Sequence, residues 1–116
     1  MHLLVFVLNK EELLDDILTG LLDIGVSGAT VVDTMGMLQV ISQDISIFAG
    51  FRSMTTGGRP HNKTVFSVIR QEDILKKAIA FIEETCQQFE ETTIGILFTT
   101  PVTHFSHLGP RKCEKR

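Results

Sequence analysis

The sequence predicts an α+β fold in which strands and helices follow one another in the order βαββαβ. Two segments repeat apolar side chains at three- and four-residue spacings, and four others are rich in β-branched and apolar residues. In addition, residues 9–14 and 70–75 align so that an acidic pair precedes an apolar pair in both halves. A repeated strand–helix–strand unit predicts a ferredoxin-like sandwich, an antiparallel four-stranded sheet with two helices on one face.

The first half begins with continuously apolar residues at 3–8, as expected of a central strand. Asn9, with Glu12 three residues later, predicts a helix N-cap. The helix that follows has an apolar stripe and is expected to stop at Gly25. Residues 29–41 are rich in β-branched types and predict a long second strand with Gly36 as a bulge.

The second half begins with a long connection over residues 42–62, which holds an apolar part and then the breaker-rich run TTGGRP at 55–60. A connection of this length in a compact domain is usually functional. A disordered insertion, or a hairpin with its apolar residues packed down, would have the same sequence pattern. Residues 64–70 alternate as a third strand, and Glu72 and Asp73 suit the start of a second amphipathic helix. Residues 92–100 predict the last strand, ended by Pro101.

Length and composition favour a single domain over residues 1–116 in the cytoplasm. A net charge of −3 argues against a nucleic-acid partner, because such proteins need surplus Lys and Arg to displace counterions from phosphates. The basic tail at 109–116 is expected to be solvated. The apolar start lacks a basic flank and is shorter than the about 20 residues of a membrane span. The two cysteines have neither CxxC nor disulfide-framework spacing, as expected of reduced thiols.

The run LDIGVSGATV at 22–31, leading to Asp33, Thr34, Met35 and Gly36, resembles the PII signal-transduction family, which acts in nitrogen regulation. Residues 63–70, 72–85 and 99–102 are similar to that family's third strand, second helix and fourth strand. The resemblance implies a homotrimer that binds a small anionic metabolite or adenine nucleotide in a cleft between subunits. It also implies that the connection at 42–62 docks onto a protein target such as a transporter or a metabolic enzyme.

The resemblance implies two sets of site residues. The residues expected near the ligand are Thr30, Gly36, Met37, Leu38, Gln39, His107 and Arg111. The residues expected to meet the partner are Phe48, Phe51, Arg52, Gly57, Gly58 and Arg59. Leu38 and Gln39 depart from the family, which has Gly and Arg there, and without any tyrosine the chain cannot use the family's tyrosine modification.

A further departure concerns the phosphates of a nucleotide. The family has a Gly- and Lys-containing phosphate loop before the fourth strand, where this chain carries Glu90 and Glu91. Carboxylates repel a triphosphate by roughly 1 kcal/mol per close charge pair even in water. No cofactor is therefore certain, and a bound nucleotide is expected to be AMP or ADP rather than ATP.

Other functions stay open at this point. His104 and His107, with Cys113 or His61, could contribute to a metal site, as in a CutA-like trimer, but two imidazoles fall short of the four ligands of structural zinc. The Gly-Gly-Arg run at 57–59 could cradle an anion or act as a hinge. The chain lacks a G-x-S-x-G nucleophile motif, and Cys86 falls on an apolar stripe, so we expect no enzyme. A catalytically silent assembly domain is the third alternative.

Overall fold

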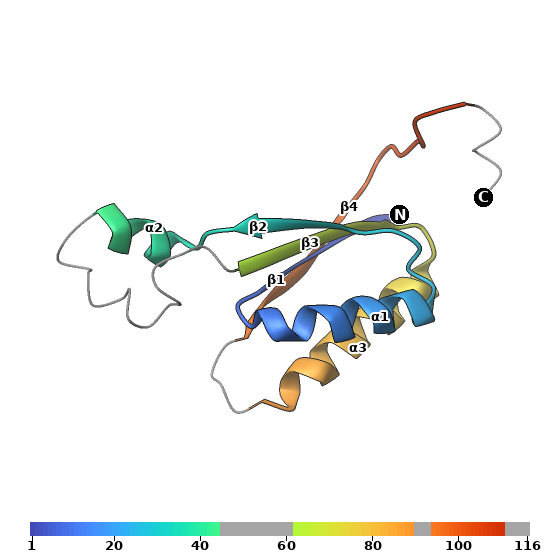
Figure 1. The fold of residues 1–116 in the computed structure, drawn as a ribbon. Coiled ribbons are helices and arrows are strands. Elements are labelled where there is room, and N and C mark those ends of the chain that lie inside the picture. Colours follow the sequence, from blue (N-terminus) through green and yellow to red (C-terminus); the bar gives the residue numbers. More distant parts are fainter. Residues whose placement is uncertain (45–61, 90–93, 111–116) are drawn as a thin grey trace.

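The computed structural model describes residues 1–44, 62–89 and 94–110 (Figure 1). Its elements, in chain order, are β1 (His2–Leu8), the 3-10 helix η1 (Glu11–Leu13), α1 (Leu14–Ile24), β2 (Thr30–Thr34), α2 (Met37–Asp44), β3 (Asn62–Ile69), α3 (Glu72–Gln87) and β4 (Gly95–Pro101). Apart from η1 and α2, this is the predicted βαββαβ order.

The four strands form one antiparallel sheet in the order β2-β3-β1-β4. β1 lies in the centre and pairs along its whole length with β3 on one side and β4 on the other. Helices α1 and α3 lie together on one face of this sheet (Figure 1). The α+β, ferredoxin-like fold predicted from the sequence is therefore confirmed.

The hydrophobic core lies between the sheet and the two helices. Successive side chains of a strand point to opposite faces, so Leu4, Phe6 and Leu8 of β1 all point toward the helices and are almost fully buried. The helices meet them with apolar stripes that include Ile17, Leu21, Leu75, Ala78 and Ile82. These are the spacings that predicted both helices.

Two glycines shape the helical layer. Gly25 ends α1 with φ of 121°, a conformation that other residues rarely adopt, and its N–H reaches the carbonyl oxygens of Leu21 and Leu22. Gly20 faces α3, where a Cβ would lie 2.1 Å from Cζ of Phe81. Because Gly20 has no side chain, the Phe81 ring of α3 lies directly against α1.

The predicted strand over 29–41 is wrong beyond Thr34, because the chain turns and forms α2 instead. The side-chain Oε1 of Gln39 accepts the N–H of Gly36 at 2.6 Å, and the N–H of Val40 reaches the Gly36 carbonyl oxygen at 3.1 Å. These contacts make a helix start where a bulge was expected. Local hydrogen bonding by one side chain thus outweighs the β-branched composition that precedes it.

Other element ends differ from prediction. Asn9 does not cap a helix: η1 begins after Lys10 without a side-chain cap, and the Asn9 N–H donates to the Ile94 carbonyl oxygen at 2.7 Å. Asn9 thereby prolongs the contact between β1 and the entrance to β4. The expected connection at 42–62 overlaps the end of α2 and the first residue of β3, and its residues 45–61 lie outside the described residues, as do 92–93 of the last predicted strand.

Two neighbouring leucines of α1 test whether this packing stabilises the fold. Leu21→Ala should lower the free energy of unfolding by about 2–5 kcal/mol, because Leu21 is only 2% exposed and its loss leaves a cavity. Leu22→Ala should change it by no more than about 0.5 kcal/mol, because Leu22 is 66% exposed. Urea unfolding followed by far-UV circular dichroism measures both, at one fixed protein concentration.

The two variants make the same chemical change one residue apart, so each controls for the other. Equal destabilisation by both would contradict the burial pattern of α1.

Candidate functional site

The chain holds the two ends of its longest connection side by side. Thr34, the last residue of β2, is the pairing partner of Asn62, the first residue of β3. α2 begins just beyond Thr34. The base of the connection is thus a defined place at one end of the sheet, built by β2, β3 and the Gly36 turn, and we take it as the candidate site.

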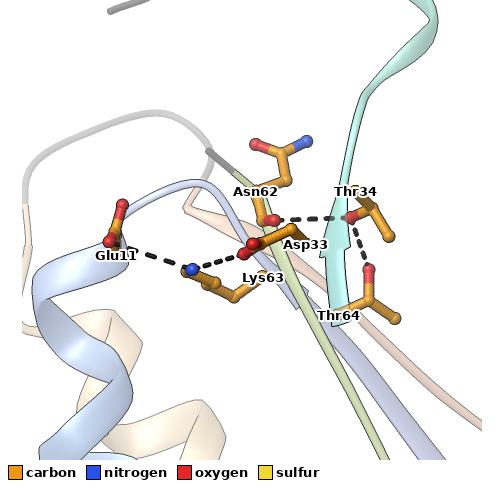
Figure 2. A network of polar contacts seen from close by, with 6 residues as sticks. All are labelled: Glu11, Asp33, Thr34, Asn62, Lys63 and Thr64. Atoms are coloured by element: carbon orange, nitrogen blue, oxygen red, sulfur yellow. Dashed lines mark hydrogen bonds and ion pairs between the residues drawn. The ribbon is translucent and has the colours of Figure 1, made fainter. Parts of the chain in front are cut away.

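On one face of the sheet, hydroxyl groups connect β2 to β3 at the base of the connection (Figure 2). The hydroxyl oxygens of Thr34 and Thr64 lie 2.7 Å apart, and Thr34 Oγ1 also lies 3.5 Å from the Asn62 carbonyl oxygen. A threonine hydroxyl has one proton to donate, so the Thr34 hydroxyl donates to Asn62 and accepts from Thr64. The two strands are joined here by side chains as well as by the backbone ladder.

On the other face the same two strands are joined by an ion pair. Lys63 Nζ bonds to Asp33, its direct cross-strand partner, and lies 3.9 Å from a carboxylate oxygen of Glu11 in η1 (Figure 2). The hydrogen bond to Asp33 raises the pKa of the Lys63 ammonium above its ordinary 10.5; desolvation opposes the rise, and attraction by Asp33 and Glu11 adds to it. The ammonium therefore stays charged and connects three elements.

Gln39, one of the predicted ligand residues, lies in the first turn of α2. Its side chain is only 6% exposed and its Oε1 is occupied by the Gly36 N–H. Gln39 thus shapes the turn into α2 rather than presenting a free amide at the surface. Its neighbour Met37 is strongly exposed, and the side chain of Leu38 lies outside the described residues.

The other predicted residues do not gather in one place within a single chain. Thr30 starts β2 opposite Phe66, whereas Gly36 follows the other end of that strand. His107 is exposed beyond β4, where its ring meets that of Phe105 at 5.0 Å. Arg111, and the partner set Phe48, Phe51, Arg52, Gly57, Gly58 and Arg59, lie outside the described residues. Of the predicted ligand residues, the structure joins Gly36 and Gln39 by a hydrogen bond.

The sheet face opposite α1 and α3 is apolar and open to solvent within the described part of the chain. Strand alternation places Val5, Val32, Phe66, Ile96 and Phe98 on it. Ile96 is 61% and Phe98 48% exposed, and Phe66 and Val32 are also exposed. Contiguous apolar surface of this kind usually marks an interaction site. We call it the open face.

Cys86 and the histidines offer little chemistry in the described residues. Cys86 is partly buried against the core, and burial raises the pKa of its thiol, which disfavours the nucleophilic thiolate. No group of three or more His, Cys, Asp or Glu side chains in residues 1–44, 62–89 and 94–110 is arranged to hold a metal ion. His61 and Cys113, which the metal hypothesis needs, fall outside these ranges.

Sequence reasoning missed Lys63, Asp33 and Glu11 as site residues. Each is an ordinary charged residue in the sequence, and they meet only because β2 and β3 pair with Asp33 opposite Lys63 while η1 lies above that end of the sheet. The one available signal was that Asp33 is the single charged residue of the strand predicted at 29–41.

No protein-family model matches the chain, and no curated protein matches its sequence. Among solved structures, the fold is similar to a protein of Thermus thermophilus provisionally described as a PII-like signalling protein, with a TM-score of 0.57. The match covers 85% of this chain and 82% of the other at 11% identity, so it supports the shared fold. No described helix is both long and apolar enough to cross a membrane.

The Lys63 ion pairs generate a titration prediction. Below pH 10.5 the ion pairs of Lys63 make their full contribution to the free energy of unfolding. This contribution is lost as the pH rises through the raised pKa of Lys63. Asp33→Asn should bring the pKa of Lys63 back toward 10.5, because it removes the charged hydrogen-bond acceptor. Glu11→Gln should lower it less, because Glu11 acts only through its charge at 3.9 Å. Carbon-13 NMR of the lysine Cε measures both.

Each variant removes one negative charge, so their difference isolates the hydrogen bond. A larger shift for Glu11→Gln than for Asp33→Asn would contradict the arrangement in Figure 2.

Proposed function

We propose that the chain is a PII-like regulatory protein, a single cytoplasmic domain without catalytic activity that assembles as a homotrimer. It senses a small anionic metabolite or an adenine nucleotide between subunits and controls a partner protein through the connection between β2 and β3. The open face is the observation that carries this proposal, since an exposed apolar face of this kind usually marks an interaction site. The similarity of fold to a PII-like signalling protein supports it.

Assembly follows from the layer arrangement. α1 and α3 cover one face of the sheet, whereas four apolar side chains of the open face, those of Val32, Phe66, Ile96 and Phe98, are exposed to solvent in a single chain. Burying apolar surface stabilises by about 25 cal/mol per Å² removed from water. Packing of open faces around a threefold axis would cover this surface and place the edges of neighbouring sheets together.

The effector site is proposed at those edges. Thr30 and Gly36 lie at opposite ends of β2, which is an edge strand, so a ligand running along that edge could reach both. A second subunit packed beside β2 would form the other side of the proposed effector site. His107 and Arg111 are proposed to come from that neighbouring subunit.

Control of a partner is proposed to act through the base of the connection. The Thr34–Thr64 and Asp33–Lys63 contacts fix where the chain leaves β2 and enters β3. A ligand at the adjacent edge would shift the connection only by contacting its arrangements unequally. The proposed target, a transporter or a metabolic enzyme, would bind one arrangement of the connection through residues such as Phe48, Phe51 and Arg59.

The assembly can be tested by sedimentation. At micromolar concentration we expect about three chains of 12.9 kDa per particle, because the open face is covered by its copies. Phe98→Glu places a charge on that face, and we expect it to yield smaller particles. Leu22→Glu places the same charge on the exposed outer side of α1 and should leave the trimer intact.

A folded monomer of the unmodified chain would exclude the trimer. Equal dissociation by both glutamate variants would show that the open face is not the interface.

Nucleotide choice can be tested by calorimetric titration. The unmodified chain should bind AMP or ADP more tightly than ATP, because Glu90 and Glu91 stand where the resembled family binds phosphates. Changing both to Lys should strengthen ATP binding by about 1 kcal/mol for each replacement, since a repulsion is replaced by an attraction.

Glu84→Lys makes the same charge change at an exposed position within α3 and should leave ATP affinity almost unchanged. Tight ATP binding by the unmodified chain would refute the charge argument. Binding of no adenine nucleotide would favour the metal-binding or silent-assembly alternative.

A further inference from the structure

We propose a second anion site, inside one subunit, where Arg70 and His107 flank a small cavity that takes a phosphate-sized oxyanion. The cavity has a volume of about 110 Å³ and lies where the end of β3, the start of α3 and the segment after β4 meet. This inference goes beyond the proposed function and does not depend on trimer assembly.

An aromatic ring positions the two basic side chains. The Arg70 guanidinium carbon lies 5.4 Å from the centre of the Phe105 ring, within cation–π range. The His107 ring meets the same phenyl ring at 5.0 Å and 79°, an edge-to-face contact. Phe105 thus connects two residues that are far apart in the chain and holds both beside one cavity.

The lining of the cavity favours negative charge. Its polar residues are Arg70, His107, Ser27 and Gln71, and no Asp or Glu is among the described residues that line it. Arg70 is exposed at the end of β3, and no ion pair within the described part of the chain involves it. A guanidinium matches an oxyanion with two parallel hydrogen bonds, and the serine hydroxyl and glutamine amide add further donors.

The first turn of α3 has two opposing electrostatic effects on an anion bound in the cavity. Gln71 and Ile74 line the cavity at the N-terminal end of this helix, where the helix dipole favours an anion and Gln71 makes no side-chain cap. Glu72 and Asp73 also belong to this turn, but neither lines the cavity. The carboxylates nearest to Arg70 in sequence are therefore not part of the cavity lining.

The size of the cavity limits the ligand. Sites for drug-sized molecules usually measure about 300–1,000 Å³, so about 110 Å³ admits a compact group and excludes a whole nucleotide. His107 is assigned to both this site and the proposed nucleotide cleft, whereas Arg70 and Ser27 belong to the cavity alone and Gly36, at the opposite end of β2, belongs to the proposed cleft alone.

The test is an NMR titration of the whole chain with inorganic phosphate, against chloride at equal ionic strength. Saturable shifts are expected at the amides of Ser27, Arg70 and His107. Arg70→Gln should weaken phosphate binding at least about tenfold, because it removes a charged, two-pronged donor. His107→Ala should weaken it less, by about threefold, because one donor on an exposed ring is lost.

Lys76→Gln removes one positive charge from an exposed position on α3 and serves as the matched control, with an expected change below about twofold. Thermal unfolding without phosphate verifies that each variant folds. Shifts that never saturate, or equal weakening by Arg70→Gln and Lys76→Gln, would overturn the proposal. Shifts confined to residues around Gly36 would also overturn it, without affecting the proposed nucleotide cleft.

Discussion

The pairing of β1 between β3 and β4 is the constraint on which the rest of this structure depends. Side chains alternate along a strand, so a one-residue slip would turn Leu4, Phe6 and Leu8 from the helical layer to the opposite face. The observed register places them against α1 and α3. It also gathers Phe66, Ile96 and Phe98 on the open face, because these residues belong to the alternate set.

The same register builds the candidate site. With β3 held by β1, its first residues Asn62, Lys63 and Thr64 lie beside the end of β2, and Asp33 comes to stand opposite Lys63. Hydroxyl contacts form on one face and the ion pair on the other. The polar base of the connection and the apolar open face are therefore two results of one strand alignment.

The candidate site was only partly predictable. Gly36 and Gln39 were both predicted to lie near a ligand, and the structure places them at the start of α2, where the Gly36 N–H donates to Oε1 of Gln39. That contact spans three residues and is compatible with several local conformations, so composition alone favoured a strand. Lys63, Asp33 and Glu11 carried no distinctive spacing, because their meeting depends on how separate elements are placed.

The sequence by itself determined the sheet, the two main helices and the stop at Gly25, because apolar periodicity and glycine conformation act over a few neighbouring residues. Only the tertiary structure decided three features. The Asn9 N–H donates to the Ile94 carbonyl oxygen just before β4, and α2 replaces the second half of the predicted second strand. Phe105 brings Arg70 and His107 to one cavity. The start of α2 depends on a local hydrogen bond from Gly36 to Gln39 that composition does not reveal. The other two outcomes depend on contacts between residues far apart in the chain, whose free energies become available only once the strands have found their register.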